Sequence, residues 1–510
     1  MKGKKLIVIM AIVILMFTIQ ASCALEDDNN FNLTQTVDIE DNKVQIDDLG
    51  KELVVSQENV SNEVSVSSQK EVSNGTHLLG ISADDNLQVS NDDDVLGRSI
   101  YVTDNTLSGL RNAINSANNG DSIFLNGLTY TGSINSITID KRITIYGGSS
   151  PDDTARATLD LSQIPASRSN KFTIKDYPVT LIGINFANYY YSPTTGDETG
   201  RSQLMRVQSG LTMKNCDFIN NSVFQKNYII DLSGMYYTTR IDNCQFINNT
   251  ASIIISTGSS SAFFTANNNR FINNSGTIND VNKTNSLGLC IKVQTSGSKF
   301  DNNTFINNTN AVHGAAYCVN ARDVVITNNH IENNQASYGA GIECHLGYVT
   351  VINTTFINNE ASGPNSQVPD RSGTGGAIAF IGPNNYLENC TFINNTAENY
   401  GGAMDIHNAN GQEAHYTTVV NSRFENNVAQ NKFAGAVYIQ GDYAKIENCN
   451  FTNNSAPTGG AIQLIGHYAN IIDSNFIENQ AITGGACYVD GYNASVTGSK
   501  FENNIATHDL

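Results

Sequence analysis

The chain contains no tryptophan, and only 15% of its 510 residues are charged. Without tryptophan, any flat aromatic platform for a sugar ring has to be built from tyrosine. Basic residues are outnumbered, 29 against 48 acidic ones, and they form no stripe. Nucleic acid is therefore not an expected partner, because a nucleic-acid site needs clustered lysine or arginine.

The apolar run at the N-terminus, residues 6–19, has 14 residues, whereas a membrane-spanning helix needs about 18 or more. Lysines within residues 2–5 precede it and small residues follow it. This pattern predicts that residues 1–24 are a secretory signal peptide and that the mature chain has no membrane span. An uncleaved anchor is the alternative. Lipid attachment at Cys23 is disfavoured, because Gln20 stands where that motif has leucine.

Residues 25–98 differ in composition from the rest. Up to Asp94 they hold 17 acidic and three basic residues, a net charge of −14. The whole chain carries −19 and the signal region +3, so residues 95–510 carry only −8. Such an acidic, aromatic-poor segment cannot bury enough apolar surface to order itself. We expect an acidic disordered linker.

One four-residue phrase occurs eleven times after residue 217: an aromatic or aliphatic residue, any residue, a polar residue, then asparagine. The phrase begins at Phe218, Phe246, Phe271, Phe305, Ile331, Phe356, Phe392, Phe424, Phe451, Phe476 and Phe501. It ends at Asn221, Asn249, Asn274, Asn308, Asn334, Asn359, Asn395, Asn427, Asn454, Asn479 and Asn504. Successive copies are never closer than 25 residues, and longer gaps reach 36. A spacing with a fixed minimum and occasional longer gaps predicts a solenoid whose coils accept loop insertions.

A coil of 25 residues without helical periodicity suits three short strands and three turns. Stacked coils form parallel sheets with a step of about 4.8 Å, so equivalent residues lie above one another. An inward phenylalanine then stacks on that of the next coil. The last asparagine of each phrase can pass amide hydrogen bonds along the stack. The residue before it is expected to be exposed in a turn.

A second phrase, such as Gly401-Gly402-Ala403-Met404, precedes segments in which apolar residues alternate with variable ones. Period two indicates a strand with one buried face. A leucine-rich repeat has a similar period, but it requires a leucine-rich consensus that this chain lacks. The sequence thus predicts an all-β parallel β-helix of about a dozen coils over residues 99–510, with clear repeats over 218–510.

The segment 99–125 is expected to cap the first coil. Apolar residues recur at helical spacing from Leu107 to Ala117, and Gly120-Asp121 ends the pattern. A short amphipathic helix there would cover the open end of the stacked core.

The repeats resemble those of chlamydial polymorphic outer-membrane proteins. The layout as a whole is similar to adhesin-like surface proteins of methanogenic archaea, from the signal through Asp92-Asp93-Asp94-Val95-Leu96-Gly97 to Leu110-Arg111-Asn112-Ala113-Ile114. The resemblance implies a right-handed β-helix of the pectate-lyase-like type, displayed at the cell surface, without catalytic residues. One departure is that such proteins often carry C-terminal modules or an anchor, and neither is recognised after Phe501.

Eight cysteines lie beyond Cys23. Four of them, Cys216, Cys244, Cys390 and Cys449, stand two residues before a repeat phenylalanine, an inward position. We interpret them as buried, unpaired thiols that act as small hydrophobic residues, although export normally favours disulfides. Cys318 is one position out of register and is expected on the outer face. No spacing resembles a zinc site, so no metal or cofactor is predicted.

Two acid–histidine pairs, Glu343 with His345 and Asp405 with His407, fall on the outward side of the strands after the glycine phrases. The alignment places the pairs on one sheet face, about 10 Å apart by two stacking steps. A carboxylate and an imidazole two residues apart can perform acid–base chemistry or bind a metal. A solvated polar face is the alternative, and these four residues are only weak catalytic candidates.

Many repeat phrases also create acceptor motifs for N-glycosylation. In six of them the acceptor is the exposed third residue of the phrase: Asn220, Asn248, Asn273, Asn307, Asn394 and Asn453.

Loop insertions near residues 277–297, 362–374 and 409–419 are candidate recognition sites, because loops on a rigid scaffold often carry binding. We therefore predict a non-catalytic, secreted or cell-surface adhesin-like protein that binds glycans or proteins of other cells. One alternative is a polysaccharide lyase or glycoside hydrolase of the same fold, and another is a structural element of the cell envelope.

Overall fold

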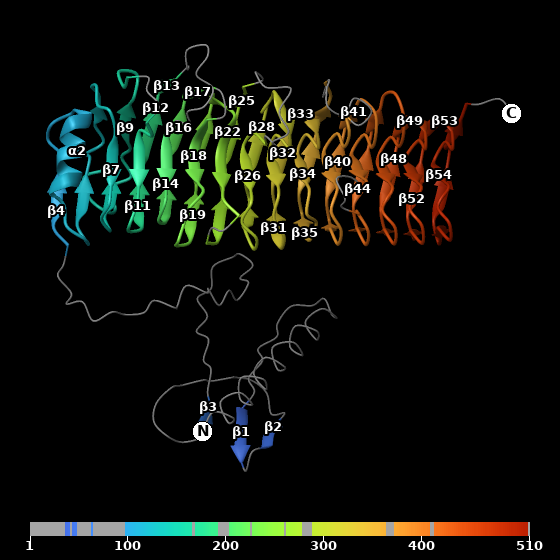
Figure 1. Cartoon of the computed structure of the whole chain (residues 1–510). Helices are drawn as coiled ribbons and strands as arrows, with labels where there is room; N and C mark the ends of the chain where they lie inside the picture. The colour runs from blue at the N-terminus through green and yellow to red at the C-terminus, as the bar shows by residue number, and fades with distance from the viewer. Residues whose placement is uncertain are drawn as a thin grey trace. The chain divides into compact units, whose positions relative to one another are not determined.

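The structure is a computed structural model that describes residues 36–40, 43–47, 63–64, 97–165, 169–191, 203–224, 227–259, 262–277, 288–363, 372–408 and 413–507 (Figure 1). The chain divides into two units, Met1–Asp92 and Asp93–Leu510.

In the first unit, strand β1 (Thr36–Glu40) pairs antiparallel with β2 (Lys43–Asp47) and β3 (Glu63–Val64). The predicted signal peptide lies outside the described residues. So does most of the segment 25–98, and its assignment as a disordered linker stays a prediction.

The second unit is a right-handed parallel β-helix, which confirms the predicted fold class (Figure 1). Three long parallel sheets run along it, with 13, 15 and 14 strands; we name them sheets I, II and III. Sheet II begins with β4 (Ser99–Tyr101) and β5 (Ser122–Phe124). An eight-stranded fourth sheet begins at β29 (Ala311–His313) and ends at β57 (Ile505–Ala506).

A single coil shows the order of the elements. Strand β38 (Ile378–Phe380) belongs to sheet I, β39 (Tyr386–Glu388) to sheet II and β40 (Thr391–Ile393) to sheet III. The short strand β41 (Thr396–Ala397) joins the fourth sheet before the glycine turn to the next coil.

Sheet I carries the candidate site. Its strands are β7 (Ile137–Ile139), β10 (Phe172–Ile174), β14 (Met205–Val207), β18 (Tyr228–Leu232), β22 (Ile253–Thr257), β26 (Ile291–Val293), β30 (Tyr317–Val319), β34 (Ile342–Cys344), β38, β42 (Met404–Ile406), β46 (Val437–Ile439), β50 (Ile462–Leu464) and β54 (Cys487–Val489).

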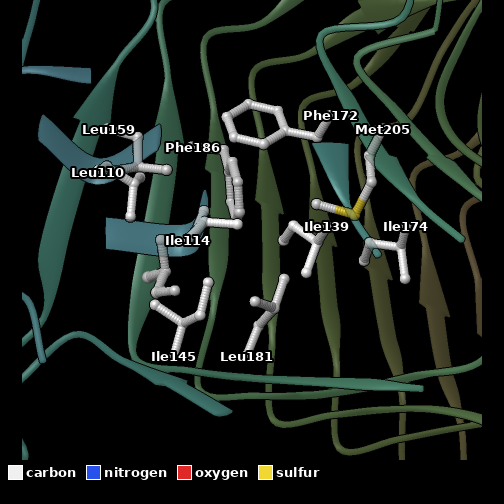
Figure 2. A pocket seen from close by; sticks show the side chains of 11 residues that line it. Leu110, Ile114, Ile139, Ile145, Leu159, Phe172, Ile174, Leu181, Phe186 and Met205 are labelled. Carbon is white, nitrogen blue, oxygen red and sulfur yellow. The ribbon is translucent and has the colours of Figure 1, made fainter. Parts of the chain in front are cut away.

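Helix α2 (Leu107–Ser116) forms where the sequence predicts a capping helix. The Thr106 hydroxyl caps it by accepting from the Gly109 N–H at 3.0 Å. Leu110 and Ile114 face the first coils across a small cavity that is lined only by apolar side chains (Figure 2). A helix does not repeat the coil spacing, so its side chains cannot interlock with the first coils as the coils do with one another.

The repeat phenylalanines of sheet III stack on one another inside the coils. Neighbouring rings are 4.6–5.2 Å apart and within 10° of parallel from Phe186 to Phe305 and again from Phe356 to Phe501. Ile331 interrupts the stack, and the ring of Tyr317 packs on Phe305 there at 4.7 Å. Phe501 is 50% exposed, because no described coil follows it.

From Asn249 to Asn479 the last asparagine of each phrase is buried and bonded to its equivalents in the coils before and after. The Oδ1 of Asn395 accepts from the backbone N–H and the Nδ2 of Asn359, both at 3.0 Å. Its Nδ2 donates to the Phe356 carbonyl and to Asn427 Oδ1, again at 3.0 Å. The third residue of the phrase, such as Asn394, is exposed in the left-handed region at φ 55°, which asparagine tolerates.

A second internal ladder, which the sequence analysis missed, runs two residues before the repeat phenylalanines. Its members are Cys216, Cys244, Asn269, Asn303, Asn329, Thr354, Cys390, Ser422, Cys449, Ser474 and Ser499. At most steps a backbone N–H donates to the side chain in the next coil, as from Cys216 to Cys244 Sγ at 3.4 Å and from Cys390 to the Ser422 hydroxyl at 3.1 Å.

The four cysteines in this ladder are therefore hydrogen-bonding groups as well as small apolar ones, which corrects their interpretation as hydrophobic residues alone. No disulfide links the eight cysteines that the structure describes. Burial raises the pKa of the Cys390 and Cys449 thiols to about 12.

Replacing Phe392 by alanine should destabilise the chain by about 3–5 kcal/mol, because it leaves a cavity in the closed ring stack. Its ring lies 4.8 Å from Phe356 and 4.7 Å from Phe424. Phe501→Ala, at the exposed end of the same stack, is the control and should cost less. Denaturant unfolding of both variants measures the difference, and equal midpoints for Phe392→Ala and wild type would contradict the stack.

Asn395→Ala should cost about 2–4 kcal/mol, because it removes four side-chain hydrogen bonds and leaves the buried Asn359 N–H unpaired. The matched control is Asn394→Gly, which keeps a residue suited to positive φ at an exposed position. We expect thermal unfolding to show a clear loss for the first variant and little change for the second. A similar loss of stability in both variants would contradict the assignment of the ladder to the last asparagine of the phrase.

Candidate functional site

One residue of each sheet I strand points outward and lies in register with its neighbours. The row from β14 onward is Arg206, Asp231, Ser256, Lys292, Cys318, Glu343, Ala379, Asp405, Tyr438, Gln463 and Tyr488. Both predicted carboxylates lie in this row, two steps apart with Ala379 between them.

From Cys318 to Gln463 this outward row is buried, unlike the outward residues of sheets II and III, such as Thr350 and Thr355, which are partly exposed. We call it the covered face. Cys318 thus lies on the outer side, as its register predicts, but it is not exposed. The expected alternative of a solvated face is wrong for Glu343 and Asp405, which are 1% and 2% exposed.

Side chains that stand just before the glycine phrases cover this face. They are His313, Tyr338, Thr374, Tyr400 and Phe433, which follow one another along the stack. Two of them reach the outward row of the next coil: His313 contacts Glu343, and the Tyr400 ring is 5.1 Å from that of Tyr438. Four of them are followed by a glycine with positive φ, and Phe433 is followed by Ala434 at φ 62°. A Cβ at Gly375, with φ 63°, would lie 2.2 Å from the Ile378 carbonyl oxygen.

Two imidazoles face Glu343, but only His313 forms a hydrogen bond with it, since His345 Nε2 is buried without a hydrogen-bond partner among the described residues. Its Oε2 is 2.5 Å from His313 Nδ1, and its Oε1 is 3.3 Å from His345 Nε2. Burial alone would raise the pKa of the Glu343 carboxyl, but the charges of His313 and His345 outweigh it and lower the pKa to about 2. Burial alone would lower the pKa of His345, but the Glu343 charge and the Cys318 thiol raise it to about 11.

The sequence analysis identified Glu343 and His345 but missed His313, which is 30 residues away from its partner. The 25-residue register could have found it, because His313 ends β29 directly before the glycine turn, one coil before Glu343. These three side chains are also the one set among the described residues whose ligating atoms could hold a metal, all lying within 4.8 Å of one another.

The second pair, Asp405 and His407, has no third ligand within the described part of the chain. His407 Nδ1 is 2.8 Å from Asp405 Oδ2. Asp405 Oδ1 is buried and has no hydrogen-bond partner among the described residues, and the same holds for Thr374 Oγ1 and Gln463 Oε1. Thr374 occupies the position one coil before Asp405 that is equivalent to that of His313 before Glu343.

A row of tyrosines follows sheet I at the turn into sheet II, which we name the tyrosine row: Tyr348, Tyr416, Tyr443 and Tyr468. All four have φ of 56–57° and are 39–53% exposed. Equivalent turns hold Asp323, Asn384 and Asn493 at similar φ. Asparagine and aspartate suit a left-handed backbone, whereas tyrosine, which is bulky, does not. The tyrosine row therefore places a disfavoured residue at four of these turns.

Three members of the tyrosine row form a continuous stack. The Tyr443 ring lies 4.9 Å from Tyr416 and 5.0 Å from Tyr468, within 9° of parallel. The residues just before them fix the turn, since the Asp442 N–H donates to His415 Nδ1 at 2.9 Å and the His467 N–H donates to Asp442 Oδ1 at 2.8 Å. The sequence signal was available in Gly441-Asp442-Tyr443 and Gly466-His467-Tyr468, which are 25 residues apart.

The six candidate glycosylation asparagines lie exposed at the turn after sheet III, at φ of 52–56°. Their side chains also bond along the stack, as from Asn307 Nδ2 to Asn273 Oδ1 at 3.1 Å. Glycan attachment at Nδ2 would therefore have to replace such contacts, and glycosylation stays a prediction.

Parts of the three predicted insertions, residues 278–287, 364–371 and 409–412, lie outside the described residues. The first two precede strands of sheet I and the third follows one. Within the described part of the chain, the single helix is the ten-residue α2, and no helix has the length and apolar character of a membrane span.

No family model matches the chain, and no curated protein shows significant similarity to it. Several solved structures match it. The complex of the alginate lyase AlyF-OU02 with G6 is 15% identical, covers 80% of this chain and 89% of its own, and has a TM-score of 0.45. The catalytic domain of a GH87 α-1,3-glucanase with tetrasaccharides is 14% identical, covers 80% and 70%, and has a TM-score of 0.40. DFA-IIIase of Arthrobacter chlorophenolicus A6, without its lid, is 11% identical, covers 77% and 99%, and has a TM-score of 0.35. At these identities the likeness concerns the fold alone.

The Glu343 cluster should stabilise the metal-free protein in a defined pH window. Because the Glu343 pKa is lowered, the ionised carboxylate stabilises the folded state fully above pH 4.5, its ordinary pKa. This stabilisation is lost as the pH falls through about 2. Because the His345 pKa is raised, the protonated imidazole stabilises the folded state fully below pH 6.5. This stabilisation is lost as the pH rises through about 11. Both shifts describe one interaction.

We therefore expect the stability difference between wild type and Glu343→Gln to be largest between pH 4.5 and 6.5 and to shrink on either side. Urea unfolding of both proteins across this range, in chelator-treated buffer, measures it. The control is Glu332→Gln, because Glu332 also pairs with a histidine, His330, but is more exposed than Glu343. Its stability difference from wild type should change much less with pH. A gap that grows steadily from pH 6.5 to 10 would contradict the ion-paired cluster.

Proposed function

We propose that this chain is a secreted or cell-surface β-helix that binds extracellular glycans, with the tyrosine row as its contact surface. The observation that carries the proposal is that successive coils hold exposed tyrosines in the left-handed backbone region. Such residues cost free energy and persist where the surroundings impose them, which is common at functional sites. Asparagine at the same turns, as at Asn384, would avoid that cost.

The chemistry of the tyrosine row suits a glycan. A tyrosine side chain combines an apolar ring with a hydroxyl group, and a glycan likewise alternates apolar C–H faces with hydroxyls. The faces of the Tyr443 ring are occupied by its neighbours, so its edge and hydroxyl remain for a ligand. The coil step repeats these groups at about 4.8 Å along the stack, which favours an extended chain over a compact molecule.

The surface location rests on the N-terminal sequence, where a charged start, a short apolar run and small residues are typical of an export signal. A rigid repeat scaffold displayed outside the cell is the arrangement expected of an adhesin-like protein. Protein ligands on other cells are the alternative class of partner, since exposed tyrosines also contribute strongly to protein interfaces.

The alternative of a polysaccharide lyase or hydrolase depends on Glu343 and Asp405. A catalytic carboxylate must come within hydrogen-bonding reach of the substrate, but both carboxylates are at most 2% exposed. Glu343 is in addition held by His313 and His345. These contacts favour binding without cleavage.

Replacing Tyr416, Tyr443 and Tyr468 together by asparagine should weaken glycan binding by about 10- to 1,000-fold. Each aromatic contact contributes about 0.5–1.5 kcal/mol, and 1.4 kcal/mol corresponds to a tenfold change in affinity. Asparagine suits the left-handed turn, so the melting temperature should be unchanged or higher. The control is Tyr236→Asn, at an 84% exposed tyrosine outside the tyrosine row.

A glycan array and whole cells probed with the full chain would measure both retention and cleavage. Saturable binding without product release, lost in the triple variant only, supports the proposal. Product release that Glu343→Gln or Asp405→Asn abolishes would replace it by the enzyme. Absence of any bound glycan or cell would favour a structural envelope role.

A further inference from the structure

Two imidazoles converge on one buried carboxylate in the covered face. Glu343 lies at the bottom, with its side chain 1% exposed, whereas the side chains of His313 and His345 are 18% and 15% exposed. One protonated imidazole is enough to neutralise one carboxylate. A second imidazole that points at the same group is unnecessary for an ion pair, but it completes a set of three ligands.

The backbone positions of the three donors are fixed before any ion binds. His313 ends strand β29 and pairs with Tyr338 of β33 (Gln335–Tyr338). The ring of Tyr338 stacks on that of His313 at 5.2 Å and 12°. Glu343 is the middle residue of β34, hydrogen-bonded between two neighbouring strands, and the His345 N–H donates to the Val319 carbonyl at 2.9 Å. Donors on strands are placed more firmly than donors on loops.

We propose that His313, Glu343 and His345 form a binding site for a divalent first-row transition metal, for which zinc is the expected ion. Two imidazole nitrogens and one carboxylate oxygen are ligands that Zn²⁺ prefers. Ca²⁺ and Mg²⁺ require sites composed mainly of oxygen atoms, so the set discriminates against them. The proposal does not depend on glycan binding by the tyrosine row.

One of the distances matches a tetrahedral site, and the His313 contact is shorter than such a site requires. Ligand bonds of about 2.0–2.2 Å put the ligand atoms about 3.4 Å apart. His345 Nε2 lies 3.3 Å from Glu343 Oε1, and His313 Nδ1 lies 2.5 Å from Oε2. No two of the three ligand atoms are farther apart than 4.8 Å. Small rotations of two partly exposed rings therefore suffice, and the fourth position remains for water or another ligand.

The test is the zinc content and affinity of the full chain after chelator treatment, dialysis and titration with Zn²⁺, followed by mass spectrometry of the metal and by calorimetry. We expect one tight zinc equivalent per chain and a higher melting temperature. His313→Asn and Glu343→Gln should each weaken binding by about 100-fold or more, because even the loss of a supporting group typically costs 10- to 100-fold. His313→Asn changes a side chain that is not fully buried, which keeps the test valid if Glu343→Gln fails to fold.

Two histidines serve as matched controls. His407→Asn changes the other acid–histidine pair of the covered face, and His330→Asn changes a more exposed pair with Glu332. Both variants should retain the tight zinc equivalent, and Ca²⁺ should not raise the melting temperature of wild type. Failure of wild type to bind Zn²⁺, equal binding by His313→Asn, or an equal response to Ca²⁺ would each overturn the proposal.

Discussion

The structure depends on the hydrogen bonds that the buried asparagines pass from coil to coil. At each step one Oδ1 accepts from the backbone and the side chain of the preceding coil, as Asn427 does from Asn395 at 2.9 and 3.0 Å. A slip by one residue would break these bonds along the whole stack and turn every inward side chain outward. The register is therefore the same at every coil, and residues 25 or more positions apart become direct neighbours.

Both candidate surfaces are products of this register. On the covered face it brings the histidine that ends β29 in one coil onto a glutamate in the next, which places His313 against Glu343. In the tyrosine row it brings identical side chains onto one another at nearly the same spacing, 4.9 and 5.0 Å. The first arrangement concentrates polar ligands in a buried position, and the second extends an exposed aromatic surface along several coils.

The sequence predicted the repeated elements well, because the repeats record the register directly. The eleven phrases give the coil length, the inward phenylalanines and the position of the asparagine ladder, and the spacing places Glu343 and Asp405 two steps apart, as the structure has them. The capping helix was predicted from a different signal, the helical spacing of its apolar residues.

What the sequence analysis missed depends on contacts between different positions of the repeat. The burial of the covered face comes from side chains such as His313 and Tyr400, which belong to the coil before the residues they cover. The cysteines were interpreted in isolation, although Asn269 and Ser422 occupy the same ladder position and reveal its hydrogen-bonding role. Tyr443 was missed although its turn recurs 25 residues later at Tyr468, because an exposed tyrosine with a left-handed backbone contradicts local preference.

The most direct test is a crystal structure of the chain with the glycan that it retains most tightly. The account predicts electron density for sugar residues against Tyr416, Tyr443 and Tyr468, with the asparagine register unchanged along the stack. Sugar density against the covered face around Glu343 and Asp405, or at another surface without contact to the tyrosine row, would contradict it.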